Sequence, residues 1–218
     1  MDSFAIDRVV SKATTGRWLL EHPFYRRWEA GELLPGELAG YAAQYRHFEA
    51  MLPGFLASVA ESLPAGEARD AVEANLDDEL GDPVPHLELF DRFAAALGVA
   101  GVAGVGASAA TAALVATYGH LAETGPVAAL AGLVAYEHQA PGIAATKAAG
   151  LRTHYQLDDE AVAFWDHHAA VDVTHARWTA EALEHLGADP DVVAASVRLT
   201  ADAWWAFLDE REAARPAA

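Results

Sequence analysis

The sequence contains no cysteine among its 218 residues. Disulfide bonds, zinc ribbons, thiolate clusters and cysteine nucleophiles are therefore excluded. Any bound metal must take its ligands from His, Asp and Glu, a donor set that favours iron, manganese or zinc. The chain is rich in such side chains, with 10 His and 32 Asp plus Glu.

Basic residues are scarce, because 14 Lys plus Arg face 32 Asp plus Glu and leave a net charge of −18. Surfaces that bind nucleic acid or anionic membranes need clustered Lys and Arg, so we expect neither partner. The first ten residues, MDSFAIDRVV, lack the apolar run of a secretory signal. Residues 93–121 carry no Asp, Glu, Lys or Arg, but glycines interrupt this run near its start. We therefore expect a cytoplasmic protein without a membrane span.

Alternation of apolar and polar residues, the pattern of a half-buried strand, is absent throughout the chain. Apolar residues instead recur at spacings of three and four, and Pro, Gly and Asp separate the segments. Asp82-Pro83 and Asp189-Pro190 both look like an N-cap followed by the first helical residue. The pattern predicts helices at residues 35–63, 65–80, 83–97, 108–123, 126–149, 159–186 and 190–211.

The connections between these segments are short, and no linker divides the chain. A glycine-rich stretch at 98–106 is expected to form a flexible loop. We therefore predict a single domain over residues 1–218, an all-α bundle of seven to eight helices.

The stretch HHAAVDVTHARW, residues 167–178, concentrates metal-capable side chains in one predicted helix. His168, Asp172 and His175 are spaced four and three residues apart, so they project within about 60° of one another around the helix axis. Two imidazoles and a carboxylate in this arrangement can share a divalent ion. Taken alone, the pattern fits ordinary polar positions equally well, and His167 and His154 do not share the face.

Two further positions extend this candidate site. Glu137 lies in the most apolar predicted helix, where a carboxylate is costly unless it is paired or metal-bound, although a position at the helix rim would also explain it. Glu79 and His86 flank the GDPVP junction, and a kink there would bring both to one metal. Spacing alone is weak evidence for this pair, because the acidic residues of DDELGD are ordinarily solvated.

The combined set Glu79-x6-His86, Glu137 and His168-x3-Asp172-x2-His175 resembles the ligand pattern of the haem-oxygenase-like di-metal oxidases. The segments LEHPFYRRWEAGEL, ANLDDELGDPVPHLELF and YEHQAPGIAATKAAGLRTHY are similar to the CADD family within that group, and more distantly to TenA/PqqC-type proteins. The similarity covers residues 5 to 210. It implies a haem-oxygenase-like (TenA/PqqC-like) bundle with two iron ions, or one iron and one manganese, that uses dioxygen and an external reductant.

Members of the CADD family are understood as para-aminobenzoate synthases, acting in folate biosynthesis, that consume one of their own tyrosines. By residue-to-residue match the resemblance implies Tyr25, in HPFYRRW, as the ring donor and Lys147, in TKAAGL, as the nitrogen donor. It also implies an oxygen-activating di-iron or Fe/Mn oxidoreductase.

The residues themselves neither require nor oppose these two roles. Tyr25 is ordinarily a packing residue with a paired hydroxyl. Lys147, one of two lysines, lies ten residues after Glu137, about 80° away if both share one helix, and a solvated lysine near a helix end is also reasonable. Tyr41, Tyr45 and Tyr136 are further aromatic candidates around the site, with core packing as the alternative.

Two other functions remain open at this point. A haem-oxygenase-like di-iron oxidase acting on an external amino acid, amine or fatty acid, by N-oxygenation, desaturation or C–C cleavage, keeps the six ligands and spares Tyr25. A protein-binding module suits the acidic helical surface, but burying six ionisable ligands without a metal is costly. We also expect a homodimer and a separate electron donor.

Overall fold

The computed structural model describes residues 3–81, 84–99 and 101–216, and these residues form helices without any strand. Two short 3-10 helices, Leu19–Glu21 and Val102–Gly104, accompany ten α-helices. The α-helices are α1 (Ser3–Ala13), α2 (Pro23–Glu29), α3 (Pro35–Ser62), α4 (Glu67–Leu80), α5 (His86–Ala96), α6 (Ala109–Thr124), α7 (Pro126–Glu137), α8 (Ala140–Tyr155), α9 (Asp159–His185) and α10 (Pro190–Ala213). The all-α prediction is confirmed.

The described residues contain more α-helices than the seven or eight expected. Two of the additional helices, α1 and α2, lie before residue 35, where no helix was predicted. The third arises because the helix expected at 126–149 is two helices, which meet at His138 and Gln139. Pro141 causes the break, since it has no N–H to donate to the carbonyl of Glu137 and its ring would clash with that carbonyl.

The helix expected at 83–97 also starts later than predicted. Asp82 and Pro83 lie outside the described residues, Val84 and Pro85 are not helical, and α5 begins at His86. The cap predicted at Asp189 is present, because its carboxylate accepts a hydrogen bond from the Asp191 N–H at 2.9 Å. Among the described residues, no helix is long and apolar enough to cross a membrane.

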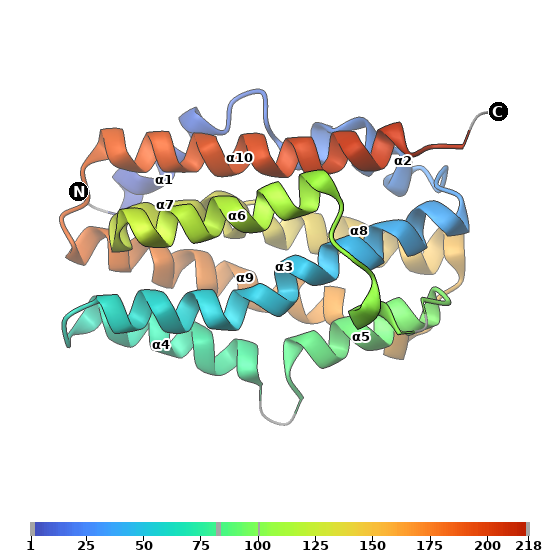
Figure 1. The fold of residues 1–218 in the computed structure, drawn as a ribbon, viewed down its shortest axis with the longest axis horizontal. Coiled ribbons are helices and arrows are strands. Elements are labelled where there is room, and N and C mark those ends of the chain that lie inside the picture. Colours follow the sequence, from blue (N-terminus) through green and yellow to red (C-terminus); the bar gives the residue numbers. More distant parts are fainter. Residues whose placement is uncertain (1–2, 82–83, 100, 217–218) are drawn as a thin grey trace.

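The long helices α3, α9 and α10 run lengthwise along the molecule (Figure 1). α9 is the central element for function, because α4, α5, α7 and α8 all pack against it. Its buried face therefore meets the end of α4, the start of α5 and the end of α7. This arrangement brings four helices to one place in the interior.

Candidate metal centre

The three candidate ligands of α9 lie on its buried face. His168, Asp172 and His175 expose 8%, 5% and 2% of their surfaces. The N–H of His168 Nδ1 donates to the carbonyl of Phe164 at 2.8 Å, which leaves the Nε2 lone pair free to bind a metal. The spacing of these residues thus produces the common orientation that the sequence predicted.

The junction between α4 and α5 brings Glu79 and His86 together. Nδ1 of His86 lies 3.0 Å from Oε2 of Glu79. Gly81 makes this turn possible with a φ of 61°, and a Cβ at this position would lie 2.2 Å from the carbonyl oxygen of Val84. The chain therefore reverses tightly enough to present a carboxylate from one helix end and an imidazole from the next helix start.

Glu137 is the last residue of α7, where the break before Pro141 ends the helix. Its carboxylate accepts hydrogen bonds from Asn75 Nδ2 at 2.8 Å and from Thr179 Oγ1 at 2.7 Å. Burial raises its pKa to about 7, against the opposing effect of His175. The side chain is thus held in the interior and is not a rim residue.

A small cavity, with a volume of about 20 Å³, joins most of these groups. It is lined by Glu79, Glu137, His168, Asp172 and His175 together with Tyr45, Phe48, Glu49, Leu52, Leu133 and Tyr136. His86 adjoins it through His168, with ring centroids 4.7 Å apart. The structure therefore brings all six predicted ligand positions together.

The donor set suits a pair of divalent first-row metal ions. It offers three imidazoles and three carboxylates, the mixture that iron and manganese accept. Nδ1 of His86 is buried and has no hydrogen-bond partner among the residues that the structure describes, although it lies close to Glu79, because the two are not aligned for a hydrogen bond. A cation between such atoms would satisfy both.

Burial governs the electrostatics of the centre. It lowers the pKa of His168 to about 3 and raises the pKa of Asp172. At His175 burial also opposes protonation, but the carboxylates of Asp172, Glu137 and Glu79 outweigh it and raise the pKa to about 9. Mutually close carboxylates and imidazoles with such opposed shifts are typical of a functional site.

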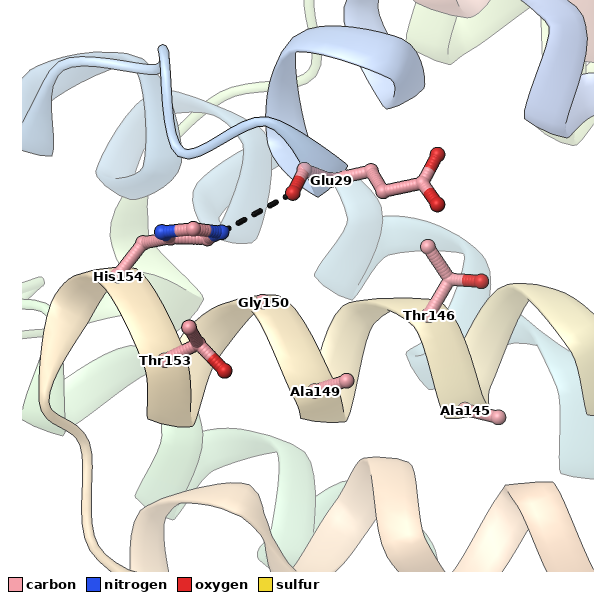
Figure 2. A pocket seen from close by; sticks show the side chains of 7 residues that line it. All are labelled: Glu29, Ala145, Thr146, Ala149, Gly150, Thr153 and His154. Atoms are coloured by element: carbon pink, nitrogen blue, oxygen red, sulfur yellow. Dashed lines mark hydrogen bonds between the residues drawn. The ribbon is translucent and has the colours of Figure 1, made fainter.

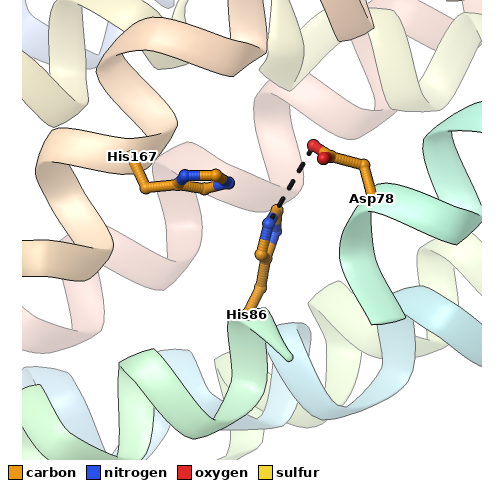
Figure 3. Close-up of side chains that lie close together, drawn as sticks. All are labelled: Asp78, His86 and His167. Carbon is orange, nitrogen blue, oxygen red and sulfur yellow. Dashed lines mark ion pairs between the residues drawn. The ribbon is translucent and has the colours of Figure 1, made fainter. Parts of the chain in front are cut away.

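A second group of metal-capable side chains, Asp78, His86 and His167, lies close together, with Asp78 and His167 partly exposed (Figure 3). Oδ2 of Asp78 lies 2.7 Å from Nε2 of His175 and 3.9 Å from Nε2 of His86. A neutral imidazole has one free lone pair, so His86 can serve one ion at a time. Asp78 contacts the inner centre through its 2.7 Å hydrogen bond with the His175 ring.

Tyr25 and Lys147 meet in a separate cluster, both of them buried. Nζ of Lys147 donates to the hydroxyl of Tyr41 at 2.5 Å, and the Tyr41 and Tyr25 hydroxyls are 2.8 Å apart. Nζ lies 4.7 Å from the Tyr25 ring centroid and 3.9 Å from that of Trp165. Burial lowers the pKa of Lys147 well below its ordinary value and raises that of Tyr25.

The interpretation of Lys147 as a solvated residue near a helix end is therefore wrong. The angle of about 80° from Glu137 assumed one continuous helix, whereas the two residues belong to α7 and α8. Tyr25 does not line the cavity, while Tyr45 and Tyr136 do, with their hydroxyls 2.6 Å apart. Tyr45 stacks on Tyr41 and thus connects the metal centre with the Tyr25–Lys147 cluster.

Sequence reasoning missed Glu49 and misjudged Asp78. Glu49 lines the cavity from α3, and its position four residues after Tyr45 on an otherwise apolar face was the available signal. Asp78 was grouped with the solvated residues of DDELGD, and only the packing of α4 against α9 singles it out.

A surface pocket beside α8 contains none of the predicted site residues (Figure 2). It is lined by Glu29, Ala145, Thr146, Ala149, Gly150, Thr153 and His154. Nε2 of His154 lies 3.1 Å from the backbone carbonyl of Glu29, which closes one end of the pocket. Lys147 belongs to the same helix but is buried away from this pocket.

The fold and the buried carboxylate–imidazole cluster define a helical bundle of the haem-oxygenase-like class. Solved structures agree on the fold. A TenA homologue from Pseudomonas syringae superposes with a TM-score of 0.82 at 14% identity, covering 98% of this chain and 96% of its own. A CADD-like protein from Nostoc punctiforme gives a TM-score of 0.77 at 19% identity, with coverages of 94% and 96%.

The sequence comparisons define the family. A family model described as "iron-containing redox enzyme" matches residues 39–205. A 4-aminobenzoate synthase of Nitrosomonas europaea is 34% identical over 92% of this chain and 88% of its own length. Another, of Chlamydia muridarum, is 33% identical over 88% and 83%. The chain belongs to the iron-containing redox enzymes with the haem-oxygenase-like fold, and its resemblance to the CADD-like proteins is confirmed.

Proposed function

We propose that this redox enzyme is a CADD-like para-aminobenzoate synthase that consumes its own Tyr25 and takes the amino nitrogen from Lys147. The observation that carries the proposal is the buried contact between these two residues, with Tyr41 hydrogen-bonded to both. The relatives named 4-aminobenzoate synthase support the product.

The metal centre in this proposal is held by Glu79, His86, Glu137, His168, Asp172 and His175. Two iron ions, or one iron and one manganese, together with dioxygen and an external reductant would supply the oxidising power needed to release the intact aromatic ring of Tyr25 from the chain. The carboxylates suit the metals because they shift between coordination modes, while the imidazoles give fixed nitrogen donors.

Residues around Lys147 prepare it as a nitrogen donor. The low pKa caused by burial favours the neutral amine, whose lone pair is the nucleophilic form. The Tyr41 hydroxyl holds Nζ beside the Tyr25 ring, and the surrounding aromatic rings exclude water. Because Tyr25 is consumed, each chain is expected to turn over about once. We also propose a separate electron donor and a homodimer in the cytoplasm.

A second candidate function is oxidation of an external small molecule at the same centre. A surface pocket of about 330 Å³ reaches Glu137 between α7 and α9, so a ligand could approach the metals from outside. This function keeps the six ligands but leaves Tyr25 intact, and its oxygen uptake would depend on an added substrate.

The deciding experiment is intact-protein mass spectrometry with peptide mapping, before and after the protein receives ferrous iron, reductant and air. We expect mass loss at Tyr25 together with released para-aminobenzoate. The variant Tyr25→Phe should release no para-aminobenzoate. Tyr155→Phe is the control and should behave as wild type, because the Tyr155 hydroxyl lies outside the cluster and accepts from the Leu33 N–H. An unchanged Tyr25 in protein that consumes oxygen would favour the external substrate.

A further inference from the structure

Glu49 is a buried carboxylate that the six-residue ligand set does not include. It exposes 3% of its surface and lines the cavity beside Glu79, Asp172 and His175. It reaches the cavity from α3, a helix that contributes no predicted ligand. The Glu49 carboxylate therefore faces the same cavity as the candidate ligands but comes from a different helix.

The partners of Glu49 do not account for its burial. The hydroxyl of Tyr45 is a hydrogen-bonding neighbour, while Oε2 is buried without a hydrogen-bond partner in the described part of the chain. No Lys, Arg or His forms an ion pair with Glu49 within the described parts of the chain. A buried carboxylate oxygen with no donor is expensive to maintain, which indicates a cation that completes the site.

The charge of the centre points in the same direction. The three carboxylates Glu79, Glu137 and Asp172 offset three of the four positive charges that two divalent ions bring. One positive charge would then remain in a nearly water-free interior, where an uncompensated charge is costly. Glu49 supplies the fourth negative charge, and the cavity becomes neutral when both ions are bound.

We propose that Glu49 is a seventh protein ligand of the metal pair and that Oε2 is its coordinating atom. The inference rests on the proposed function insofar as that function requires two bound ions. Carboxylate oxygen is a suitable donor for divalent iron or manganese. α3 also carries Tyr45 and Tyr41, and Tyr41 is the hydrogen-bond partner of Lys147. A metal-bound Glu49 therefore fixes the position of α3, and with it that of Tyr41, relative to the metals.

The test is an anaerobic titration of the metal-free protein with Mn²⁺. Binding is measured by calorimetry and, independently, by the electron paramagnetic resonance signal of the Mn²⁺ that remains free. Wild type should bind two ions. Glu49→Gln, which keeps the size but loses the charge, should bind at least one of them about tenfold more weakly or worse. Glu61→Gln, the same change at an exposed position of α3, is the matched control and should bind as wild type.

Melting of the metal-free variants separates ligation from structural support. Metal-free Glu49→Gln should melt at the wild-type temperature or higher, because it no longer buries an ionisable group, although its metal affinity falls. If Glu49 had only a structural role, its replacement would lower both the melting temperature of the metal-free protein and the metal affinity. Glu49→Asp, which keeps a shorter carboxylate, should give an intermediate affinity and serves if the glutamine variant does not fold.

The possible results are distinguishable. Equal affinities of wild type and Glu49→Gln for both ions overturn the role of Glu49 and leave the six-ligand centre intact. Loss of affinity together with a lowered melting temperature of the metal-free variant also overturns it. A wild-type protein that binds fewer than two ions contradicts the two-metal centre of the proposed function and this inference with it.

Discussion

Lys147 is an unusual residue because its amine is fully buried and forms no ion pair with a carboxylate of the described residues. It hydrogen-bonds to Tyr41, and aromatic rings surround the rest of its head group. Aromatic faces attract a cation, but they do not replace the water that an ammonium loses on burial. The protein therefore carries a stability cost at this position, which fits a residue kept for reactivity.

The cost at Lys147 predicts a pH-dependent difference between wild type and Lys147→Met. The folded-state pKa lies below the unfolded one, so the unfolded state binds more protons between the two values and wild-type stability rises with pH. The excess stability of metal-free Lys147→Met over wild type should therefore be largest at the lowest pH measured and fall as the pH rises towards 10.5. Between the two pKa values it should fall by about 1.4 kcal/mol for each pH unit.

Urea unfolding at pH 7, 8.5 and 10 measures this difference. Lys12→Met changes the other lysine of the chain, which is exposed, and is the matched control. A stability difference for Lys147→Met that stays constant across these pH values would contradict the lowered pKa.

Asp78 shows how a partly exposed residue can act on a buried centre. Its Oδ2 accepts from the N–H of His175 Nε2 at 2.7 Å, which directs the other ring nitrogen towards Asp172. Asp78→Asn should weaken metal binding about 10- to 100-fold, because the amide no longer fixes the tautomer of His175. Titration with Mn²⁺ measures the effect. Asp77→Asn, at the exposed neighbouring position, should bind as wild type, and equal affinity in both variants would remove this role from Asp78.

At the scale of helices, the close contact of α2 and α8 brings Tyr25 to Lys147. Trp28 of α2 donates its Nε1–H to the carbonyl of Lys147 at 3.3 Å. Gly150 of α8 permits this approach, since a Cβ there would lie 3.0 Å from Trp28 Cδ1 and 3.2 Å from the Trp28 carbonyl oxygen. The backbone of α2 cannot move away without moving Tyr25.

Gly150→Ala should therefore destabilise the protein by about 1 kcal/mol, since crowding costs about 1–3 kcal/mol and the gain in helix propensity returns about 1 kcal/mol. It should also reduce para-aminobenzoate formation by displacing Tyr25. Gly142→Ala is the matched control in α8, because its Cβ would meet only Leu20 Cδ1 at 3.8 Å. Thermal melting and the product assay would show the difference, and equal behaviour of the two variants would count against the tight contact.

The helices after residue 35 were predictable from the spacing of apolar residues, but two boundaries that shape the site were predicted wrongly. Pro141 lies inside the helix expected at 126–149, and a proline within a helical pattern is itself a signal of a break, so the end of α7 near Glu137 could have been predicted. The start of α5 at His86 depends instead on a turn with Gly81 at positive φ. That turn is local backbone geometry that a periodicity of 3.6 residues does not contain.

For the whole molecule, a metal pair that binds only the folded chain should stabilise it strongly. The candidate ligands come from α4, α5, α7 and α9, so the unfolded chain has no equivalent site. Mn²⁺ at about 100 times its dissociation constant should add about 2.7 kcal/mol for each bound ion, about 5.4 kcal/mol for the pair, and raise the melting temperature by about 10–20 °C for a chain of this length.

Anaerobic thermal melts with Mn²⁺, with excess chelator and with Ca²⁺ as the control ion measure this stabilisation. Ca²⁺ prefers oxygen ligands alone and should give little stabilisation at a site with three imidazoles. Identical melting temperatures with Mn²⁺ and chelator would argue against a folded metal centre.

The sequence by itself determined the helical class, the common face of His168, Asp172 and His175, and the absence of thiolate chemistry, because these follow from residue types and their local spacing. Only the tertiary structure decided that Glu79, His86 and Glu137 join that face, that Glu49 lines the same cavity, and that Lys147 lies against Tyr25. These contacts link helices far apart in the chain, and the packing of whole helices sets their distances. Local periodicity carries no information about such packing.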